Sequence, residues 1–292
     1  LRDVDIAMYR AKTMGKSRFR IFGKKLHQMT HDALQLENDL KTALKKKQFT
    51  LYYQPIVFSK TGRLKGFEAL IRWKHPDKGI IPPSDFIPVA ENNGQIIPIG
   101  QWVIETACRQ LKTWQEKFPS HKHLTISVNI SVQQFSYNNL EKIVEATLNE
   151  TRLAAHCFVA ELTESAIIDK PEAVIVHLNR LKQSGIKIAI DDFGTGYFSL
   201  AYLKNFPLDF LKIDKSFVND INRDHENLEI AKAIITLAQN LNLEIIAEGI
   251  ESNGQLETLQ GLGCDFIQGY YFSKPVDSAR AQDLILNDIQ DK

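Results

Sequence analysis

The stretch Ile188–Tyr197 has the sequence IAIDDFGTGY, in which an apolar run ends in two aspartates and a loop with two glycines follows. A short uninterrupted apolar run is typical of a strand that is buried on both faces. Asp191 and Asp192 therefore stand at the end of a buried strand, where neighbouring carboxylates repel each other and lose hydration. A divalent metal ion is the usual partner that offsets such a cost. One aspartate could instead cap the next helix, but a cap accounts for only one of the pair.

From Trp73 onward, short apolar strands alternate with longer helical patterns. The predicted strands are Leu124–Asn129, Phe158–Leu162, Ile186–Ile190, Phe210–Ile213, Glu244–Ala247 and Asp265–Ile267. The predicted helices are Ile97–Lys117, Asn139–Glu150, Pro171–Ser184, Leu228–Asn240 and Gln255–Leu262. Strands that alternate with helices are typical of a parallel sheet.

Two further strands are predicted before this region, at Phe49–Phe58 and Leu64–Trp73. The segment Ser59–Arg63 between them is short and turn-like, whereas parallel neighbours need a crossover of about a dozen residues or more. The two strands are therefore expected to be antiparallel. With the six later strands they make eight, the number that closes a β/α barrel. The predicted fold is α/β, a TIM-like (β/α)8 barrel whose first strand is antiparallel.

The composition is that of an ordinary soluble globular chain, with 43% hydrophobic and 24% charged residues among 292. A formal net charge of +1 argues against a generally basic surface for a nucleic-acid polymer. Cys108, Cys157 and Cys264 lie far apart and match no zinc-binding spacing, so we expect reduced thiols in the cytoplasm. No apolar run is long enough to span a membrane and no signal peptide is visible, so we expect no membrane contact by this stretch.

The N-terminal part is expected to form two segments before the barrel. Residues 1–24 predict a helix and a short strand, a piece too small to form a core alone. Residues 25–47 predict a long amphipathic linker helix, and residues 48–292 the barrel domain. The chain begins abruptly within a helical pattern, which is expected of a fragment from a longer protein.

In such a barrel the active site lies at the C-terminal ends of the strands. Polar side chains recur at or near these ends on seven successive strands. They are Glu68, Asn129, Glu161, Asp191 with Asp192, Lys212 with Asp214, Glu248 and Gln268. A helix cap or a solvated loop would explain any one of them, but their recurrence at equivalent positions indicates a shared site.

The candidate ligands are oxygen donors without histidine or cysteine, which suits Mg²⁺ or Mn²⁺ rather than zinc. A carboxylate pair can flank two metal ions, an arrangement that serves in-line phosphoryl transfer. Lys212 would then hold an attacking water or neutralise a phosphate. The structural alternative for Lys212 is a salt bridge to Asp214 or to a nearby glutamate, and only geometry separates the two.

The tripeptide Glu68-Ala69-Leu70, within Phe67–Trp73, resembles the signature of EAL domains, the cyclic di-GMP phosphodiesterases. Further similar motifs follow in family order, over roughly Leu44 to Leu286. They are Tyr53–Ile56, His75-Pro76, Pro83, Phe86–Pro88, Ala90-Glu91, Asn129–Ser131, Glu161–Ser165, Asp191–Leu200, Leu211–Val218, Ala247–Glu251 and Gln268–Tyr270. Three letters alone are a weak match, whereas this ordered series is highly specific.

A second resemblance covers the N-terminal segment. Asp5–Lys12, with Gly15, Arg18 and Phe22, looks like the last helix and strand of a GGDEF domain. The glycine-rich catalytic turn of that family is absent, so no diguanylate cyclase activity is expected. The resemblance implies a parent protein with upstream GGDEF and sensory domains, and that parent could be membrane-anchored.

The EAL resemblance implies two Mg²⁺ or Mn²⁺ ions and hydrolysis of cyclic di-GMP to the linear dinucleotide pGpG. The implied ligands are Glu68, Asn129, Glu161 and Asp191 for one ion, and Asp191, Asp192 and Glu248 for the other, with Asp191 bridging. The implied catalytic set is Lys212, which would orient the attacking water, with Glu248, Asp191, Asp192 and Glu251. The implied substrate contacts are Gln54, Leu70, Arg72, Asp214 and Gln268, the last of which would also support water near the metals.

The segment Asp191–Leu200, called loop 6 below, departs from the family at Phe198, where serine is common. Glu164 would anchor loop 6 from beneath. We expect Phe198 to pack under the loop or at a dimer contact, because the carboxylates, glycines and lysine are intact. Altered loop closure is the alternative. We also expect a homodimer through the barrel face near loop 6.

The predicted function is that of a metal-dependent cyclic di-GMP phosphodiesterase in bacterial second-messenger signalling. One alternative is a catalytically silent EAL domain that binds cyclic di-GMP as a receptor. Such receptors usually lack some of the carboxylates, the lysine or loop 6, and none of these is missing here. A second alternative is a structural module for dimerisation, which would leave the intact metal set unexplained.

Overall fold

The computed structural model describes residues 35–136, 140–164, 171–196 and 203–290. These residues belong to two compact units. Of the described residues, the smaller unit comprises 35–49 and Trp73–Gln95, and the larger comprises Thr50–Arg72 and the described residues from Ile96 onward. The helix and strand expected within residues 1–24, and the first part of the expected linker helix, lie outside the described residues.

The smaller unit has an aromatic core. The ring centroids of Phe49, Trp73 and Phe86 lie 5.7–5.9 Å from one another. The side chains of Trp73 and Phe86 are fully buried. Pro83 starts the helix of this unit, where its fixed φ and missing N–H are tolerated. The elements are a helix at 35–43, the end of strand β2 (Leu64–His75), strand β3 (Gly79–Ile81) and helix α3 (Pro83–Asn92).

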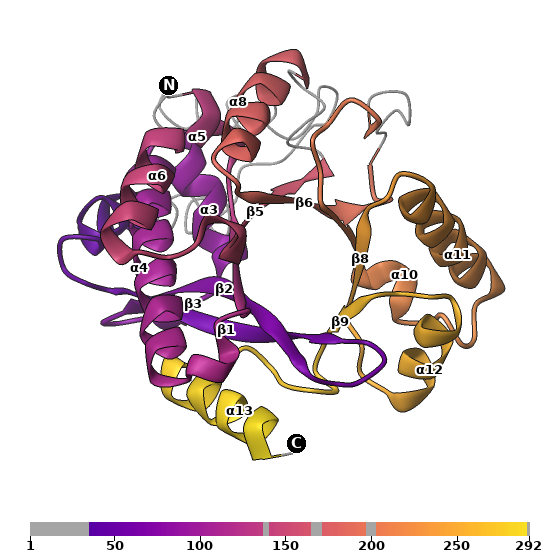
Figure 1. Ribbon diagram of the computed structural model, residues 1–292. Helices are drawn as coiled ribbons and strands as arrows, with labels where there is room; N and C mark the ends of the chain where they lie inside the picture. Colours follow the sequence, from indigo (N-terminus) through magenta and orange to yellow (C-terminus); the bar gives the residue numbers. More distant parts are fainter. Residues whose placement is uncertain (1–34, 137–139, 165–170, 197–202, 291–292) are drawn as a thin grey trace, which may run out of the picture. The chain divides into compact units, whose positions relative to one another are not determined.

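The larger unit is a ring of strands, which Figure 1 shows end-on. The strands are β1 (Phe49–Phe58), β2, β4 (Thr125–Asn129), β5 (Phe158–Thr163), β6 (Lys187–Phe193), β7 (Phe210–Ile213), β8 (Glu244–Glu248) and β9 (Phe266–Gln268). From β2 to β9 the neighbours in the ring are parallel. β1 pairs antiparallel with β9 and also pairs with β2, so the ring is closed. The predicted TIM-like barrel with an antiparallel first strand is therefore confirmed.

Helices separate the parallel strands along the chain and surround the ring in Figure 1. They are α4 (Ile96–Lys117), α5 (Val132–Ser136), α6 (Leu140–Thr151), α8 (Pro171–Gln183), α10 (Lys215–Val218), α11 (His225–Asn240), α12 (Asn253–Gly261) and α13 (Ser278–Gln290), with short 3-10 turns η1 (Pro119–His121) and η2 (Ala155–Cys157). Within the described ranges, no helix combines the length and apolar character that crossing a bilayer requires.

The strands place polar residues above an apolar layer inside the barrel. One inward side chain from each of six strands contributes to an apolar cluster, made of Ile56, Val159, Ala189, Phe210, Ile246 and Phe266. Because side chains alternate along a strand, the residue two positions later in a parallel strand, or two positions earlier in the antiparallel β1, lies on the same side. These residues are Gln54, Glu161, Asp191, Lys212, Glu248 and Gln268, all expected site residues. The alternation of side chains therefore places a layer of polar residues next to a layer of apolar residues inside the barrel.

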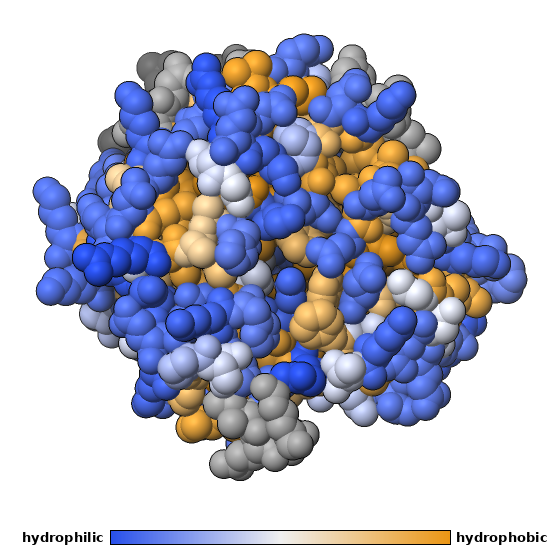
Figure 2. Space-filling view, in the orientation of Figure 1, coloured by the Kyte–Doolittle hydropathy of each residue, from blue (hydrophilic) through white to orange (hydrophobic). Residues whose placement is uncertain are grey.

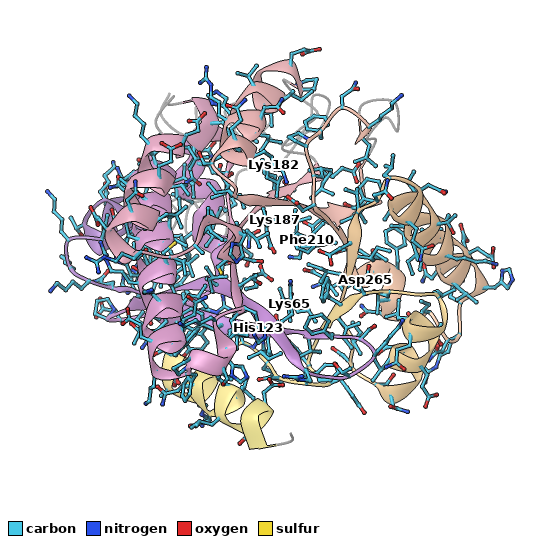
Figure 3. All side chains as sticks on the ribbon, viewed as in Figure 1. Lys65, His123, Lys182, Lys187, Phe210 and Asp265 are labelled. Atoms are coloured by element: carbon cyan, nitrogen blue, oxygen red, sulfur yellow. The ribbon has the colours of Figure 1, made fainter. Side chains whose placement is uncertain are left out.

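The opposite rim, where the parallel strands begin, is held by local ion pairs. Both Lys182 and Lys187 lie 2.7 Å from Asp209, whose carboxylate also accepts a hydrogen bond from the Ile188 N–H. Figure 3 labels both lysines beside the barrel opening. These contacts tie the start of β6 to the residue that precedes β7.

Candidate metal centre

Asp191 and Asp192 are brought to one side of β6 by an irregularity in the strand. Successive residues of a regular strand face opposite sides, which would separate the two carboxylates. The pairing of β6 with β7 shifts register between Ile190 and Phe193, and Asp192 has φ 54°. Such a bulge, with a residue in the left-handed region, redirects a side chain. As a result, oxygens of Asp191, Asp192 and Glu248 lie within 4.8 Å of one another.

A second group of carboxylates shares Asp191 with the first. Oxygens of Glu68, Glu161 and Asp191 also lie within 4.8 Å of one another, and all three residues are buried. The two groups correspond to the carboxylates expected for two metal ions. Asp191 belongs to both groups, as expected of a bridging ligand.

Lys212 is fully buried at the junction of the two groups. Its Nζ lies 2.7 Å from carboxylate oxygens of both Glu161 and Glu248. It is also 3.2 Å from Asp191 and 3.6 Å from Glu68. Burial alone would lower the pKa of Lys212, but these carboxylates raise it well above its ordinary value, so the side chain is an ammonium. Among the described residues, no ion pair joins Lys212 to Asp214, whereas the contacts with Glu161 and Glu248 are the salt bridges to nearby glutamates that the structural alternative expected.

Amide donors orient Glu68. Asn129 donates to its Oε1 at 2.7 Å, and Gln268 donates to its Oε2 at 2.6 Å. Gln268 also donates to Oε1 of Gln54 at 3.1 Å. Burial acts to raise the pKa of Glu68, but Lys212 and the two amides hold it below its ordinary value. Glu68 is therefore a fixed, ionised carboxylate.

The site carries more negative charge than the protein itself neutralises. One ammonium faces the four carboxylates of Glu68, Glu161, Asp191 and Glu248. Burial raises the pKa of Glu161 to about 8 and shifts those of Asp191 and Glu248 upward, because one lysine cannot offset all four charges. Burial, with the charges of Asp191 and Asp214, raises the pKa of Asp192 to about 6. A bound cation would relieve this excess.

The donor atoms fit a hard divalent metal ion. The ligand atoms that the described residues bring together here are carboxylate oxygens, with the Lys212 ammonium between them, and oxygens are the ligands of Mg²⁺ and Mn²⁺. The buried Oε1 of Glu161 accepts no hydrogen bond from any described residue. A buried carboxylate oxygen without a partner is costly, and a metal ion would satisfy it.

Glu164 holds the described part of loop 6 from below. Its Oε2 accepts a hydrogen bond from the Gly194 N–H at 2.8 Å. A Cβ at Gly196 would collide with the Glu164 carboxylate, so glycine permits this close approach. Glu164 thus contacts the loop that it was expected to support, whereas Phe198 lies outside the described residues.

Arg72 and Leu70 stand half-buried near the end of β2, outside the carboxylate cluster. The Arg72 guanidinium lies over the Tyr52 ring, 5.6 Å from its centroid, and donates to the Ile71 carbonyl. Tyr52 is not among the site residues expected from the sequence. Its position two residues before Gln54 on β1 was the available signal, because both then face the same side.

Two of the expected site residues, Asp214 and Glu251, do not belong to either carboxylate group. Asp214 caps α10 by accepting a hydrogen bond from the Ser216 N–H at 2.9 Å, and its charge acts on Asp192. Glu251 is exposed, and its backbone N–H donates to the side chain of Gln255. The structure therefore places Asp214 beside the second carboxylate group and gives Glu251 no described contact with it.

Comparison with known proteins links this geometry to one family. The family model described as EAL domain matches residues 37–275. The bifunctional diguanylate cyclase/cyclic di-GMP phosphodiesterase MucR of Pseudomonas aeruginosa is 40% identical over 274 residues, 94% of this chain and 40% of that protein. The cyclic di-GMP phosphodiesterase PdeR of Escherichia coli is 37% identical over 276 residues, 94% of this chain and 41% of that protein.

A solved structure shares both sequence and fold with this chain. It is titled PaMucR phosphodiesterase, c-di-GMP complex, and is 41% identical with a TM-score of 0.81. The match covers 85% of this chain and 99% of that one. This chain spans about 40% of the length of the two curated relatives named above. From the family match and these alignments, the chain belongs to the EAL domain family.

Proposed function

We propose that this chain hydrolyses cyclic di-GMP to the linear dinucleotide pGpG in a metal-dependent reaction. The observation that carries the proposal is the pair of carboxylate groups that share Asp191 around the buried ammonium of Lys212. The names of the relatives support the substrate, because MucR and PdeR are both described as cyclic di-GMP phosphodiesterases.

Two Mg²⁺ or Mn²⁺ ions are the proposed cofactors. Glu68, Asn129, Glu161 and Asp191 would hold one ion, and Asp191, Asp192 and Glu248 the other. Bound there, the ions would supply Lewis acidity that activates water and stabilises charge on the attacking and leaving oxygens.

The residues have separate tasks in the proposed reaction. A water oxygen bonds to phosphorus, the bond from phosphorus to the ribose O3′ breaks, and O3′ takes a proton. Lys212 lies between the two carboxylate groups, from where its ammonium can orient the water and offset phosphoryl charge. Gln268 keeps Glu68 in place by donating to its carboxylate.

Substrate binding is assigned to the rim around this centre. Arg72 would contact a phosphate or guanine of the ligand, and its position over Tyr52 keeps the guanidinium in a defined place. Gln54, Leu70, Asp214 and Gln268 are the other proposed contacts. Glu251 would either contact the substrate directly or act indirectly by positioning a neighbouring residue.

The decisive experiment incubates the purified chain with cyclic di-GMP and Mg²⁺ or Mn²⁺ and separates the products by chromatography. The expected product is pGpG, and EDTA should abolish it. Glu161→Gln, which keeps the shape but removes a charge, should lower the rate strongly. Binding of cyclic di-GMP without any pGpG would replace the proposal with the receptor function.

We propose three further properties of the protein. Residues 1–24 would be the end of a GGDEF domain, as the bifunctional name of MucR and its alignment over 94% of this chain support. A homodimer would form through the barrel face near loop 6. A cytoplasmic location is supported by Cys108, Cys157 and Cys264, which are all buried free thiols.

A further inference from the structure

A groove lies at the N-terminal ends of β4 and β5, away from the metal centre. Its volume is about 560 Å³, which is within the range of small-molecule sites. Its lining includes Lys112, Gln115, Glu116, Lys122, Arg152 and His156. The expected metal ligands Asn129 and Glu161 stand at the other ends of the same two strands. The groove therefore lies apart from the metal centre on the barrel.

The groove contains three permanent cations and one carboxylate. Glu116 lies 3.7 Å from Lys112, but its side chain is 69% exposed, so the pair is screened by water. The Lys112 ammonium also donates to the Arg152 carbonyl at 3.2 Å, which fixes it beside the groove. Neither Lys122 nor Arg152 has an acidic partner in the part of the chain that the structure describes. Lys122 and Arg152 are exposed like Glu116, but three cations against one carboxylate leave a net positive charge, which favours an anion.

Arg152 occupies a backbone conformation that glycine would adopt at lower cost. It directly follows α6, and its φ of 54° is in the left-handed region. Glycine is the residue that most often ends a helix in this conformation. The chain instead places a guanidinium there, at the lip of a basic groove.

Gln115 adds a neutral acceptor to the groove. This residue is only 6% exposed. Its Nε2 donates to the carbonyls of Lys122 and Leu124, at 3.0 and 3.1 Å. Its Oε1 accepts no hydrogen bond from the described residues, so this oxygen remains available for an N–H or O–H donor.

Cys157 lies next to Gln115 and His156 of the groove lining, and its thiol is affected by nearby cations. Burial raises the pKa of the Cys157 thiol, while the hydrogen bond with Gln115 and the charges of Lys65 and Lys112 act in the opposite direction. In Figure 3, Lys65 and His123 lie beside the barrel opening. The face seen in Figure 2 is mainly hydrophilic, with apolar atoms between polar ones. The lining of the groove itself is mostly charged and polar, so a polar anion suits it better than an apolar partner.

We propose that this groove binds a phosphorylated nucleoside. Lys112, Lys122 and Arg152 would bind its phosphates, since lysine and arginine pair strongly with phosphate oxygens. The Gln115 Oε1 would accept a hydrogen bond from the base or sugar. The volume accommodates more than a single phosphate ion. This site does not depend on the proposed hydrolysis, because none of these residues belongs to the metal centre.

The test is isothermal titration calorimetry of the full chain with ADP in EDTA-containing, low-salt buffer. One saturable site is expected. The double variant Lys122→Gln/Arg152→Gly should raise the Kd at least tenfold, because it removes two cations. Glycine at position 152 suits the positive φ, so the variant should fold. Lys232→Gln/Arg280→Gln, which removes two exposed cations from α11 and α13, should leave the Kd within twofold.

Two more arms separate this site from the catalytic rim and identify the ligand class. Arg72→Ala should leave the Kd for ADP unchanged, and pyrophosphate should bind more weakly than ADP. Absence of ADP binding at millimolar concentration would overturn the proposal, as would an equal Kd in the Lys122/Arg152 variant. Loss of binding in Arg72→Ala would assign the nucleotide to the catalytic rim. Equal affinity for pyrophosphate would exclude the nucleoside contact.

Discussion

At the scale of single residues, the site depends on a few side chains in unusual positions. Asp192 has a positive φ, and Lys212 is a fully buried lysine. Both features are costly by themselves, because left-handed backbone disfavours most side chains and buried charges need partners. Favourable interactions with neighbouring groups must offset these costs. Here the neighbouring groups are the carboxylates of the metal centre.

The first prediction concerns Asp192→Asn. Asparagine is isosteric and tolerates the left-handed region, so the fold should be retained. The lost negative charge should weaken the second metal ion and lower turnover by about 10²-fold or more, the scale of one electrostatic group. Turnover as a function of Mg²⁺ concentration measures both effects. Undiminished turnover at limiting Mg²⁺ would remove Asp192 from the metal site.

The second prediction concerns Lys212→Ala. An interaction that strengthens in the transition state appears in kcat rather than in binding. The variant should keep its affinity for cyclic di-GMP within about tenfold while turnover falls by about 10²-fold or more. Steady-state kinetics and calorimetry measure the two quantities separately.

Two variants act as controls for that experiment. Lys212→Met keeps the bulk of the side chain, so it distinguishes loss of charge from a cavity among the carboxylates. Arg72→Ala should show the opposite balance, with weaker binding first. Intact turnover in Lys212→Ala would leave the lysine with a structural role only.

The third prediction concerns Phe198. Gly194, Thr195, Gly196 and Tyr197 on one side of it carry the resemblance of this segment to loop 6 of the family. Phe198→Ser should therefore change turnover by less than about tenfold, a difference of 1.4 kcal/mol or less in activation free energy. A rise by orders of magnitude would show that Phe198 restrains the enzyme and would favour the receptor interpretation.

At the scale of elements, local capping decides where helices begin. The sequence pattern predicts α11 from Leu228, but the helix starts at His225 because Asp224 accepts a hydrogen bond from the Glu226 N–H. Similarly, α12 starts before the predicted Gln255, because Ser252 and Gln255 form a capping box. Apolar periodicity begins after the first turn, so a prediction based on periodicity starts too late.

The fourth prediction concerns the contact between β2 and β4. A Cβ at Gly66 would collide with the side-chain and backbone oxygens of Thr125. Gly66→Ala should therefore destabilise the barrel by about 1–3 kcal/mol, as overpacking generally does. Gly261→Ala is the matched control, because a Cβ there meets open space and alanine favours helix α12. Urea denaturation measures the free energy of unfolding of both variants. Equal stability of the two variants would mean that β2 and β4 can move apart to accommodate the methyl group at no cost.

At the scale of the whole molecule, the acidic centre links stability to pH and metal. Burial raises the pKa of Glu161 to about 8, whereas an unfolded glutamate titrates near its ordinary value of about 4.3. Between these values the folded chain holds a proton that the unfolded chain has released. Without metal, the free energy of unfolding should therefore fall as pH rises from about 4 to 8.

The fifth prediction follows from this linkage. In EDTA, the Tm should fall by roughly 5 °C or more between pH 6 and pH 8. Mg²⁺ should raise the Tm more at pH 8 than at pH 6, because metal ions bind the deprotonated carboxylates. Differential scanning fluorimetry measures both. Equal stabilisation by Mg²⁺ at the two pH values would mean that the carboxylates are already ionised.

Much of this protein is determined by its sequence alone. The alternation of strands and helices indicates the parallel barrel, and the short link Ser59–Arg63 requires an antiparallel first pair. The two-residue period of the strands also predicts that polar residues at their ends share one rim. These features are local, so propensity and spacing are sufficient to predict them.

Other features are decided only by the tertiary structure. The bulge that turns Asp192 toward Asp191 depends on the pairing of β6 with β7. The choice of partners for Lys212 depends on strands that are distant in sequence, and the groove beside Arg152 depends on how α4 packs near β4. Sequence patterns describe which side of an element a residue occupies. Distances between elements arise from packing, which no local pattern contains.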